Sequence, residues 1–301
     1  MKKFSSTRAA AVGMAGALAL AGVVGTGVVS PANASSVTDT YSCVLTGLGP
    51  TDMPVTATMA LPSSIQSGAD LPSRSVSMSV DILPATVASL AQVLGSLFGH
   101  QLTGISGTAD GVAFPVAGSA SPLALNTVSI PVAHPDSTTG HLILAGTGTT
   151  KAFRAGLPGA HAVTMPSTFT FVPTASFVGI PDQALTPINC TSTESTPSTV
   201  ATMNVVKATS VTTAKLLNAP VTTVKHAKIL ATVKAAGHAA TGKVYAYQGT
   251  KLLKSATLSG GKATLVLPLL ARGSHTVKVL YKATTANQAS SKSLTFSVTR
   301  G

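Results

Sequence analysis

The residues of this chain that could do chemistry are few, and the densest group of them lies between His134 and His141. His134-Pro135-Asp136 and His141 place two imidazoles and one carboxylate within eight residues. Zinc accepts both ligand types, but a zinc site needs a further ligand and closer pairing than this spacing offers. An Asp that follows Pro, as Asp136 does, more often shapes a turn. We therefore expect a loop here, with no metal and no cofactor.

Catalytic motifs are equally scarce elsewhere. Asp and Glu number eight, and the single Glu, Glu194, lies in a Ser/Thr-rich stretch. Gly104-Ile105-Ser106-Gly107 has the wrong spacing for a nucleophile elbow, and neither a phosphate loop nor a dinucleotide fingerprint occurs. A paired-carboxylate hydrolase would have to use Asp residues that mostly sit beside Pro, Gly or Thr. We expect a non-catalytic protein, and an exported hydrolase or carbohydrate-active protein with its site in the N-terminal half is the alternative.

A surface is the remaining candidate for function. Lys243, Tyr245 and Tyr247 alternate with Val244 and Ala246, so the first three point outward from one predicted strand. If that strand pairs with residues 274–282, Lys278 and Lys282 lie on the same face. Cations beside exposed aromatic rings suit phosphate polymers, acidic glycans or nucleic acid. The candidate ligand surface is therefore formed by Lys243, Tyr245, Tyr247, Lys278 and Lys282.

The alternative for these lysines is an evenly charged shell that keeps an exported domain soluble. Lys228, Lys234 and Lys262 fall on other predicted strands, which favours this alternative. Neutral sugars are weaker candidates as ligands, because the chain has no Trp and four Tyr to stack on them.

Composition indicates what holds these residues in place. Of 301 residues, 45% are hydrophobic, 9% charged and 4% aromatic, which excludes both a disordered chain and a coiled coil. Val, Thr, Ser, Ala, Gly and Pro predominate, as in small β proteins with many turns. We predict an all-β protein of two β-sandwich-like domains, the first with one short helix and the second immunoglobulin-like.

The N-terminal segment resembles an export signal. Lys2, Lys3 and Arg8 precede an apolar run, and Ala32-Asn33-Ala34 matches a cleavage site. We expect residues 1–34 to be a signal peptide, the mature protein to be secreted or associated with the cell envelope, and no integral membrane segment after cleavage. A retained membrane anchor is the alternative, since about 20 apolar residues can span a bilayer.

Export changes the interpretation of the two cysteines. In an oxidising compartment an isolated pair is first a disulfide candidate. A Cys43–Cys190 bond would close a loop of roughly 150 residues and stabilise the fold by about 5 kcal/mol in the chain-entropy model. Two buried free thiols or a metal site are the less favoured interpretations.

Charge divides the chain into two parts. Residues 35–197 carry eight acidic and three basic side chains, a balance of −5, whereas residues 198–301 carry fourteen Lys or Arg and no Asp or Glu, a balance of +14. Such asymmetry is typical of two separate domains. We place the first domain at 35–190, a Ser/Thr/Pro-rich linker at 191–200 and the basic domain at 201–301.

The basic domain has the pattern of an antiparallel sandwich. Short alternating strands are separated by turns such as Thr241-Gly242 and Ser259-Gly260-Gly261. The order of three segments resembles the bacterial immunoglobulin-like repeat of secreted surface proteins over about residues 205–299. These segments are Thr241-Gly242-Lys243-Val244, Leu258-Ser259-Gly260-Gly261-Lys262-Ala263-Thr264-Leu265, and Gly273-Ser274-His275-Thr276-Val277 with Tyr281. The loop after Tyr281, often acidic in that family, has no acid here, so no calcium is expected.

The first domain is also mainly β, with less regular spacing. Strands are predicted near residues 41–45, 55–60, 76–82, 128–132, 141–145 and 168–172. Residues 85–97 favour a helix after Pro84, with Val87, Leu90, Ala91, Leu94 and Leu97 on one face. Thr40-Tyr41-Ser42-Cys43, this helix and Asn189-Cys190 together resemble an uncharacterised secreted domain of actinobacterial proteins. That resemblance implies a disulfide-closed β-rich domain and no known activity.

These features predict a secreted, non-catalytic binding or adhesion-type protein. Its basic immunoglobulin-like domain would retain it on anionic cell-wall polymers or acidic glycans through electrostatic attraction of low specificity.

Overall fold

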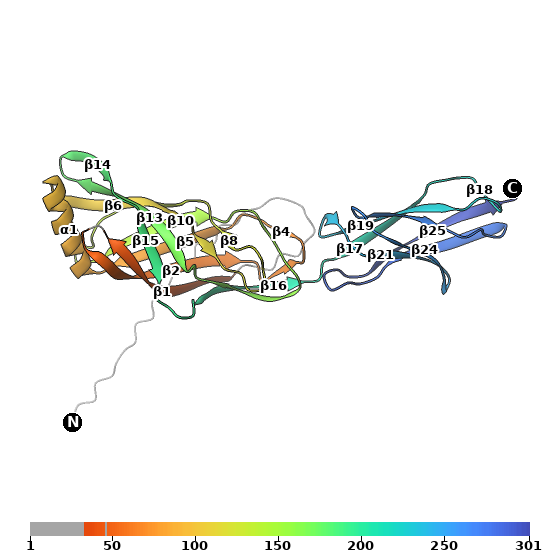
Figure 1. The fold of residues 1–301 in the computed structure, drawn as a ribbon, viewed down its shortest axis with the longest axis horizontal. Helices are drawn as coiled ribbons and strands as arrows, with labels where there is room; N and C mark the ends of the chain where they lie inside the picture. The colour runs from red at the N-terminus through yellow and green to blue at the C-terminus, as the bar shows by residue number, and fades with distance from the viewer. Residues whose placement is uncertain (1–32, 46) are drawn as a thin grey trace, which may run out of the picture.

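The computed structural model describes residues 33–45 and 47–301, which form an elongated molecule of two β domains (Figure 1). The first domain is built around a nine-stranded antiparallel sheet. Its strands are β1 (Asn33–Leu45), β2 (Gly49–Leu61), β5 (Ser75–Ile82), β6 (Leu102–Asp110), β9 (Val128–Ala133), β10 (Leu142–Thr149), β13 (Thr168–Phe177), β14 (Ile180–Ala184) and β15 (Ile188–Ser192).

This sheet closes on itself. The strand order is β14-β13-β15-β1-β2-β5-β10-β9-β6, and β6 pairs again with β13, so all strands except β14 form a ring. Alternate side chains of each strand point inward. In β13 the buried residues are Phe169, Phe171, Pro173, Ala175 and Phe177, with half-buried or exposed residues between them. The predicted all-β class is confirmed, and ring closure means that the first domain's sheet has few free edges.

Helix α1 (Pro84–Phe98) lies across the end of the first domain that faces away from the second domain (Figure 1). Pro84 stands in the first turn, and Gly99 ends the helix in the left-handed conformation while its N–H donates to the Gly95 carbonyl. Val87, Leu90 and Leu94 are buried, as predicted, whereas Leu97 is 67% exposed. The helix covers the end of the ring with a narrower apolar stripe than we expected.

Short strands extend the first domain toward the second. They are β3 (Ser64–Gln66), β4 (Asp70–Leu71), β7 (Ala113–Phe114), β8 (Leu123–Ala124), β11 (Phe153–Arg154), β12 (Gly159–Thr164) and β16 (Thr199–Val206). They form three small sheets, β11-β4, β7-β8 and β12-β16-β3.

Residues 191–200, which we expected to form a linker, are tied to the first domain in this structure. They contain the end of β15 and the start of β16, and the loop between these strands is held by Asp39, whose Oδ2 accepts from the Ser198 N–H at 3.0 Å. Val200, Met203 and Val205 of β16 belong to the first hydrophobic core. Composition predicted solvated chain here, but the apolar residues of β16 give this strand a face to bury. The change from one core to the other falls between Val205 and Ala208.

The second domain is a sandwich of two sheets with an immunoglobulin-like arrangement. One sheet contains β17 (Ser210–Leu216), β19 (Lys228–Ala235), β20 (His238–Ala239) and β23 (Lys262–Val266). The other has the order β18 (Val221–Thr222), β25 (Ser290–Thr299), β24 (Gly273–Tyr281), β21 (Lys243–Gln248) and β22 (Lys251–Thr257). The predicted sandwich is confirmed, while the more specific likeness to the bacterial surface repeat stays a prediction.

In addition to the connecting peptide, two polar contacts link the domains. The Thr209 N–H donates to Gln66 Oε1 at 3.0 Å, and His238 Nε2 lies 3.2 Å from Asp70 Oδ2. Both contacts use residues of β3, β4 and β20 at the facing ends of the two domains.

The expected signal peptide falls almost entirely on residues 1–32, which lie outside the described residues. Asn33 and Ala34 of the expected cleavage motif belong to β1, where they pair with Leu61 and Ala60 of β2. Within residues 33–45 and 47–301, no helix is long and apolar enough to cross a membrane.

Candidate ligand-binding surface

Strands β21 and β24 position the candidate surface. They pair antiparallel, with Tyr247 opposite Lys278 and Tyr245 opposite Leu280. Side chains directly opposite one another in a sheet share a face. Val244 and Ala246 point into the core with none of their surface exposed, so Lys243, Tyr245 and Tyr247 face outward. The structure therefore brings the five residues that we singled out onto one face of one sheet.

The rings and ammonium groups on this face are in contact. The ring centroids of Tyr245 and Tyr247 lie 6.4 Å apart, with an angle of 29° between the ring planes. Lys282 Nζ lies 4.6 Å from the Tyr245 ring centroid, within the range of a cation–π interaction. Lys243, Lys278 and Lys282 are exposed, whereas both tyrosines are half-buried by their neighbours.

The electrostatics of the face are one-sided, because residues 198–301 contain no Asp or Glu. Its lysines therefore have no carboxylate partner within their own domain. Successive outward residues of a strand are about 7 Å apart, which gives the face a regular ladder of rings and cations. Such a ladder can contact several anionic groups of one extended polymer while its rings stack on sugars or bases.

Two aliphatic side chains border the surface, and the sequence analysis did not identify them. Leu280 lies opposite Tyr245, and Leu252 of β22 lies opposite Tyr247 with 49% of its side chain exposed. The register between β21 and β22 shifts between Ala246 and Tyr247. A bulge of this kind leaves no clear mark in sequence alternation, so the position of Leu252 could not be predicted.

Lysines of the other sheet do not share this arrangement. Lys234 of β19 and Lys262 of β23 are exposed, but they lie on the opposite sheet, where no tyrosine is found. Lys234 and Lys262 therefore provide positive charge without neighbouring tyrosine rings, which makes them a matched control for the tyrosine-containing face.

The His134–His141 group does not converge. His134 Nδ1 donates to the Thr103 carbonyl at 2.7 Å, while His141 Nδ1 lies 2.8 Å from Asp81 Oδ1. Asp136 Oδ1 accepts from the backbone N–H groups of Thr138 and Thr139 and from the Thr139 hydroxyl. These hydrogen bonds, led by those from Thr139, hold the pKa of Asp136 below its ordinary value. Among residues 33–45 and 47–301, no three His, Cys, Asp or Glu side chains gather as metal ligands would.

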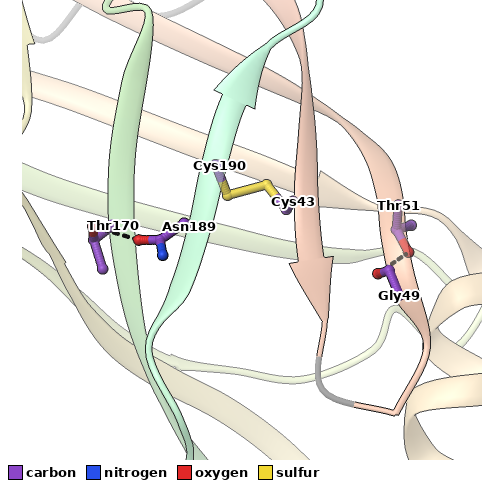
Figure 2. Close-up of a disulfide and its surroundings, with 6 residues drawn as sticks. All are labelled: Cys43, Gly49, Thr51, Thr170, Asn189 and Cys190. Atoms are coloured by element: carbon purple, nitrogen blue, oxygen red, sulfur yellow. Dashed lines mark hydrogen bonds between the residues drawn. A yellow bond between two sulfur atoms is a disulfide. The ribbon is translucent and has the colours of Figure 1, made fainter.

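The predicted disulfide is confirmed. Cys43 of β1 lies directly opposite Cys190 of β15, and the two sulfurs are bonded across these neighbouring strands (Figure 2). Figure 2 also shows Thr170 Oγ1 donating to Asn189 Oδ1 at 3.0 Å on the adjacent strand pair. The bond is compatible with a protein that folds in an oxidising compartment.

The interior of the first domain is apolar around this bond. A cavity of about 40 Å³ lies beside the disulfide, lined only by aliphatic and aromatic side chains, Pro173 and the cystine. Its lining offers no acid, base or nucleophile. Next to it in β1, Tyr41 is fully buried, and its hydroxyl donates to the Pro166 carbonyl. Burial, and secondarily the nearby Asp39 carboxylate, raise the pKa of Tyr41 far above its ordinary value.

Comparisons with known proteins place the first domain in a family. A family of unknown function (DUF6801) matches residues 40–196, which is just over half of the chain, so the chain belongs to this family. The expectation that the first domain is an uncharacterised one is thereby confirmed. No curated protein matches the chain.

Two solved structures show limited similarity. Fibronectin(III)-like modules of Clostridium thermocellum CbhA align at 12% identity and a TM-score of 0.26, covering 81% of this chain and 94% of that one. The BSP domain of a biofilm associated protein aligns at 9% identity and a TM-score of 0.24, covering 92% of this chain and 53% of that one. At these TM-scores neither similarity carries an argument about this protein.

Proposed function

We propose that this member of the DUF6801 family is an exported, non-catalytic binding protein, held on anionic polymers of the cell envelope by its basic domain. The observation that carries the proposal is the face of Lys243, Tyr245, Tyr247, Lys278 and Lys282 within a domain that has no acidic side chain. Anionic wall polymers and acidic glycans are the proposed ligand class.

Export is supported by the sequence at residues 1–34 and by the Cys43–Cys190 bond. A binding role without catalysis is supported by the separate hydrogen-bond partners of His134, Asp136 and His141. These groups stabilise local turns and strand ends instead of meeting at a common point.

The physical basis of retention is the release of counterions. A linear polyanion carries condensed cations, and each lysine or arginine that neutralises one anionic group frees a cation into solution. Affinity should therefore fall steeply as salt concentration rises. The tyrosines add uncharged contacts with the polymer, so their removal should weaken binding at every salt concentration.

The experiment measures binding of the full chain to immobilised heparin across a series of NaCl concentrations. We expect Lys278→Ser with Lys282→Ser to weaken binding more than the matched pair Lys234→Ser with Lys262→Ser, which removes equal charge from the other sheet. Tyr245→Ala with Tyr247→Ala should weaken binding at unchanged net charge. Equal losses from both lysine pairs, with no effect of the tyrosines, would contradict the assignment to this face. Absence of binding at low salt would overturn the proposal.

A further inference from the structure

The second domain has a distinct apolar end that its ligand surface does not include. Three aliphatic side chains protrude from loops there: Leu217 is 49% exposed, Val224 74% and Leu269 53%. We call the loops 217–227 and 268–272 the distal tip. Strand β18, which lies within the first of these loops, and the end of β25 that pairs with it reach the end of the molecule that points away from the first domain (Figure 1).

Hydrogen bonds join the loops of the distal tip into one unit. Asn218 Nδ2 donates to the His226 carbonyl at 2.7 Å, and Asn218 Oδ1 accepts from the Lys228 N–H at 2.7 Å. His226 Nδ1 in turn donates to the Leu267 carbonyl at 2.7 Å. The second loop is held at its other end by His275, whose Nε2 donates to the Ala271 carbonyl at 2.7 Å.

Val224 occupies the most exposed position of this unit. It lies in a tight turn that is closed by the Lys225 N–H donating to the Thr222 carbonyl at 3.0 Å. Turn positions of this kind usually carry Gly, Asn, Asp or Ser. With 74% of its surface exposed, this aliphatic side chain gains little burial within the domain, so an apolar surface outside the chain would bury it further.

Four cations lie on the same loops and strand ends as these aliphatic residues. Lys225, Lys228, Arg272 and Arg300 are all exposed on the loops and strand ends of the distal tip. Because residues 198–301 contain no Asp or Glu, no acidic side chain of the domain offsets this charge. Exposed aliphatic side chains and cations on the same loops suit a bilayer surface, in which anionic headgroups overlie hydrocarbon.

We propose that the distal tip inserts Val224 and Leu269 into the outer layer of a membrane containing anionic lipids, while the cations of the tip contact the headgroups. Insertion of the aliphatic side chains alone, or contact of the cations with headgroups alone, gives weak and reversible binding. The two together bind the membrane more firmly. Hydrogen bonds within the tip already satisfy several of its backbone groups, which lowers the cost of contact with an apolar layer.

The test uses the full chain and vesicles of phosphatidylcholine that contain about 30% of the anionic lipid phosphatidylglycerol. We expect Val224→Ser with Leu269→Ser to lower the affinity for vesicles at least about tenfold. Burial of one aliphatic side chain of this size changes a binding constant by about that factor. The matched control is Val206→Ser with Val211→Ser, which removes two aliphatic side chains, 39% and 60% exposed, near the junction with the first domain. The control should bind vesicles as the original chain does.

A second measurement reports insertion directly. The chain has no Trp, so Val224→Trp supplies a single indole without background. We expect its emission to shift to the blue on anionic vesicles, with no shift for Val211→Trp. Binding of the Val224→Ser, Leu269→Ser variant to heparin should be unchanged, which separates this proposal from the polymer-binding one. Equal loss in the control, no spectral shift, or no vesicle binding at low salt would overturn it.

Discussion

Tyr41 shows how a single hydroxyl can connect burial to alkaline stability. Its ring packs edge-on against Phe169, with 5.2 Å between ring centroids, and its hydroxyl donates to the Pro166 carbonyl. Ionisation would remove that donor and place a phenolate near Asp39 inside the first domain. The folded state therefore binds the phenolic proton more tightly than the unfolded state does.

We predict that Tyr41→Phe makes the first domain less sensitive to alkaline pH. Because folding raises the pKa of Tyr41, its contribution to stability is fully present below pH 10, the ordinary value, and is lost as pH rises above it. The original chain should lose up to about 1.4 kcal/mol per pH unit more than the variant above that point. Urea unfolding at several pH values measures the difference. Parallel pH dependence of the two proteins would contradict the prediction.

The Cys43–Cys190 disulfide should stabilise the first domain and leave the second domain unaffected. Cys43 and Cys190 are 147 residues apart, so removing the bond by Cys43→Ser with Cys190→Ser should cost the first domain about 5 kcal/mol in the chain-entropy model. Unfolding of the second domain should not change, because its core is separate. Differential scanning calorimetry distinguishes the two transitions. Thiol labelling of the unfolded, unreduced original chain should find no free sulfhydryl, and labelling of both cysteines would refute the bond.

Among the elements, the seam between β6 and β13 closes the ring of the first domain. Gly107 allows the two strands to approach there. A Cβ atom at this position would lie 2.3 Å from the Val172 carbonyl oxygen, a backbone atom that cannot turn aside. Glycine at this position is therefore a requirement of strand pairing and not of a turn.

We predict that Gly107→Ala destabilises the first domain by about 1–3 kcal/mol, the usual cost of forcing extra volume into a packed site. The control is Gly156→Ala, because a Cβ at Gly156 would have nothing within 4 Å. Thermal unfolding followed by circular dichroism compares the two variants. Equal midpoints for both would show that the seam can open without cost.

Sequence patterns predicted the helix and the strands better than they predicted which strands pair to close the ring of the first domain. Helix α1 begins one residue before the predicted segment and ends one after it, because Pro84 and the apolar spacing are local signals. Strand alternation likewise identified β21 and β24 and the outward face of Lys243, Tyr245 and Tyr247. Pairing of β6 with β13 joins residues 60 to 75 positions apart, and no local pattern encodes that partner choice. The same holds for Leu252, whose place beside Tyr247 depends on a register shift.

At the scale of the whole molecule, the boundary between domains decides which fragments can fold. The Ser/Thr/Pro-rich composition of residues 191–199 favours a solvated linker, yet β16 follows at once and completes the sheet with β12 and β3. The change in side-chain charge near residue 198 therefore lies inside the first domain's fold. Charge distribution indicated that two domains exist, but burial determines where the first one ends.

We predict that a fragment of residues 33–207 folds, whereas residues 33–197 are much less stable. The shorter fragment lacks Val200, Met203 and Val205, each at most 2% exposed in the intact chain. Burial of such a side chain contributes about 1.5–3 kcal/mol, so their joint loss is comparable to the whole stability of a domain this size. Urea unfolding of the two fragments, both with the disulfide intact, measures the difference. Equal unfolding midpoints would show that β16 only lies against the first domain without stabilising it.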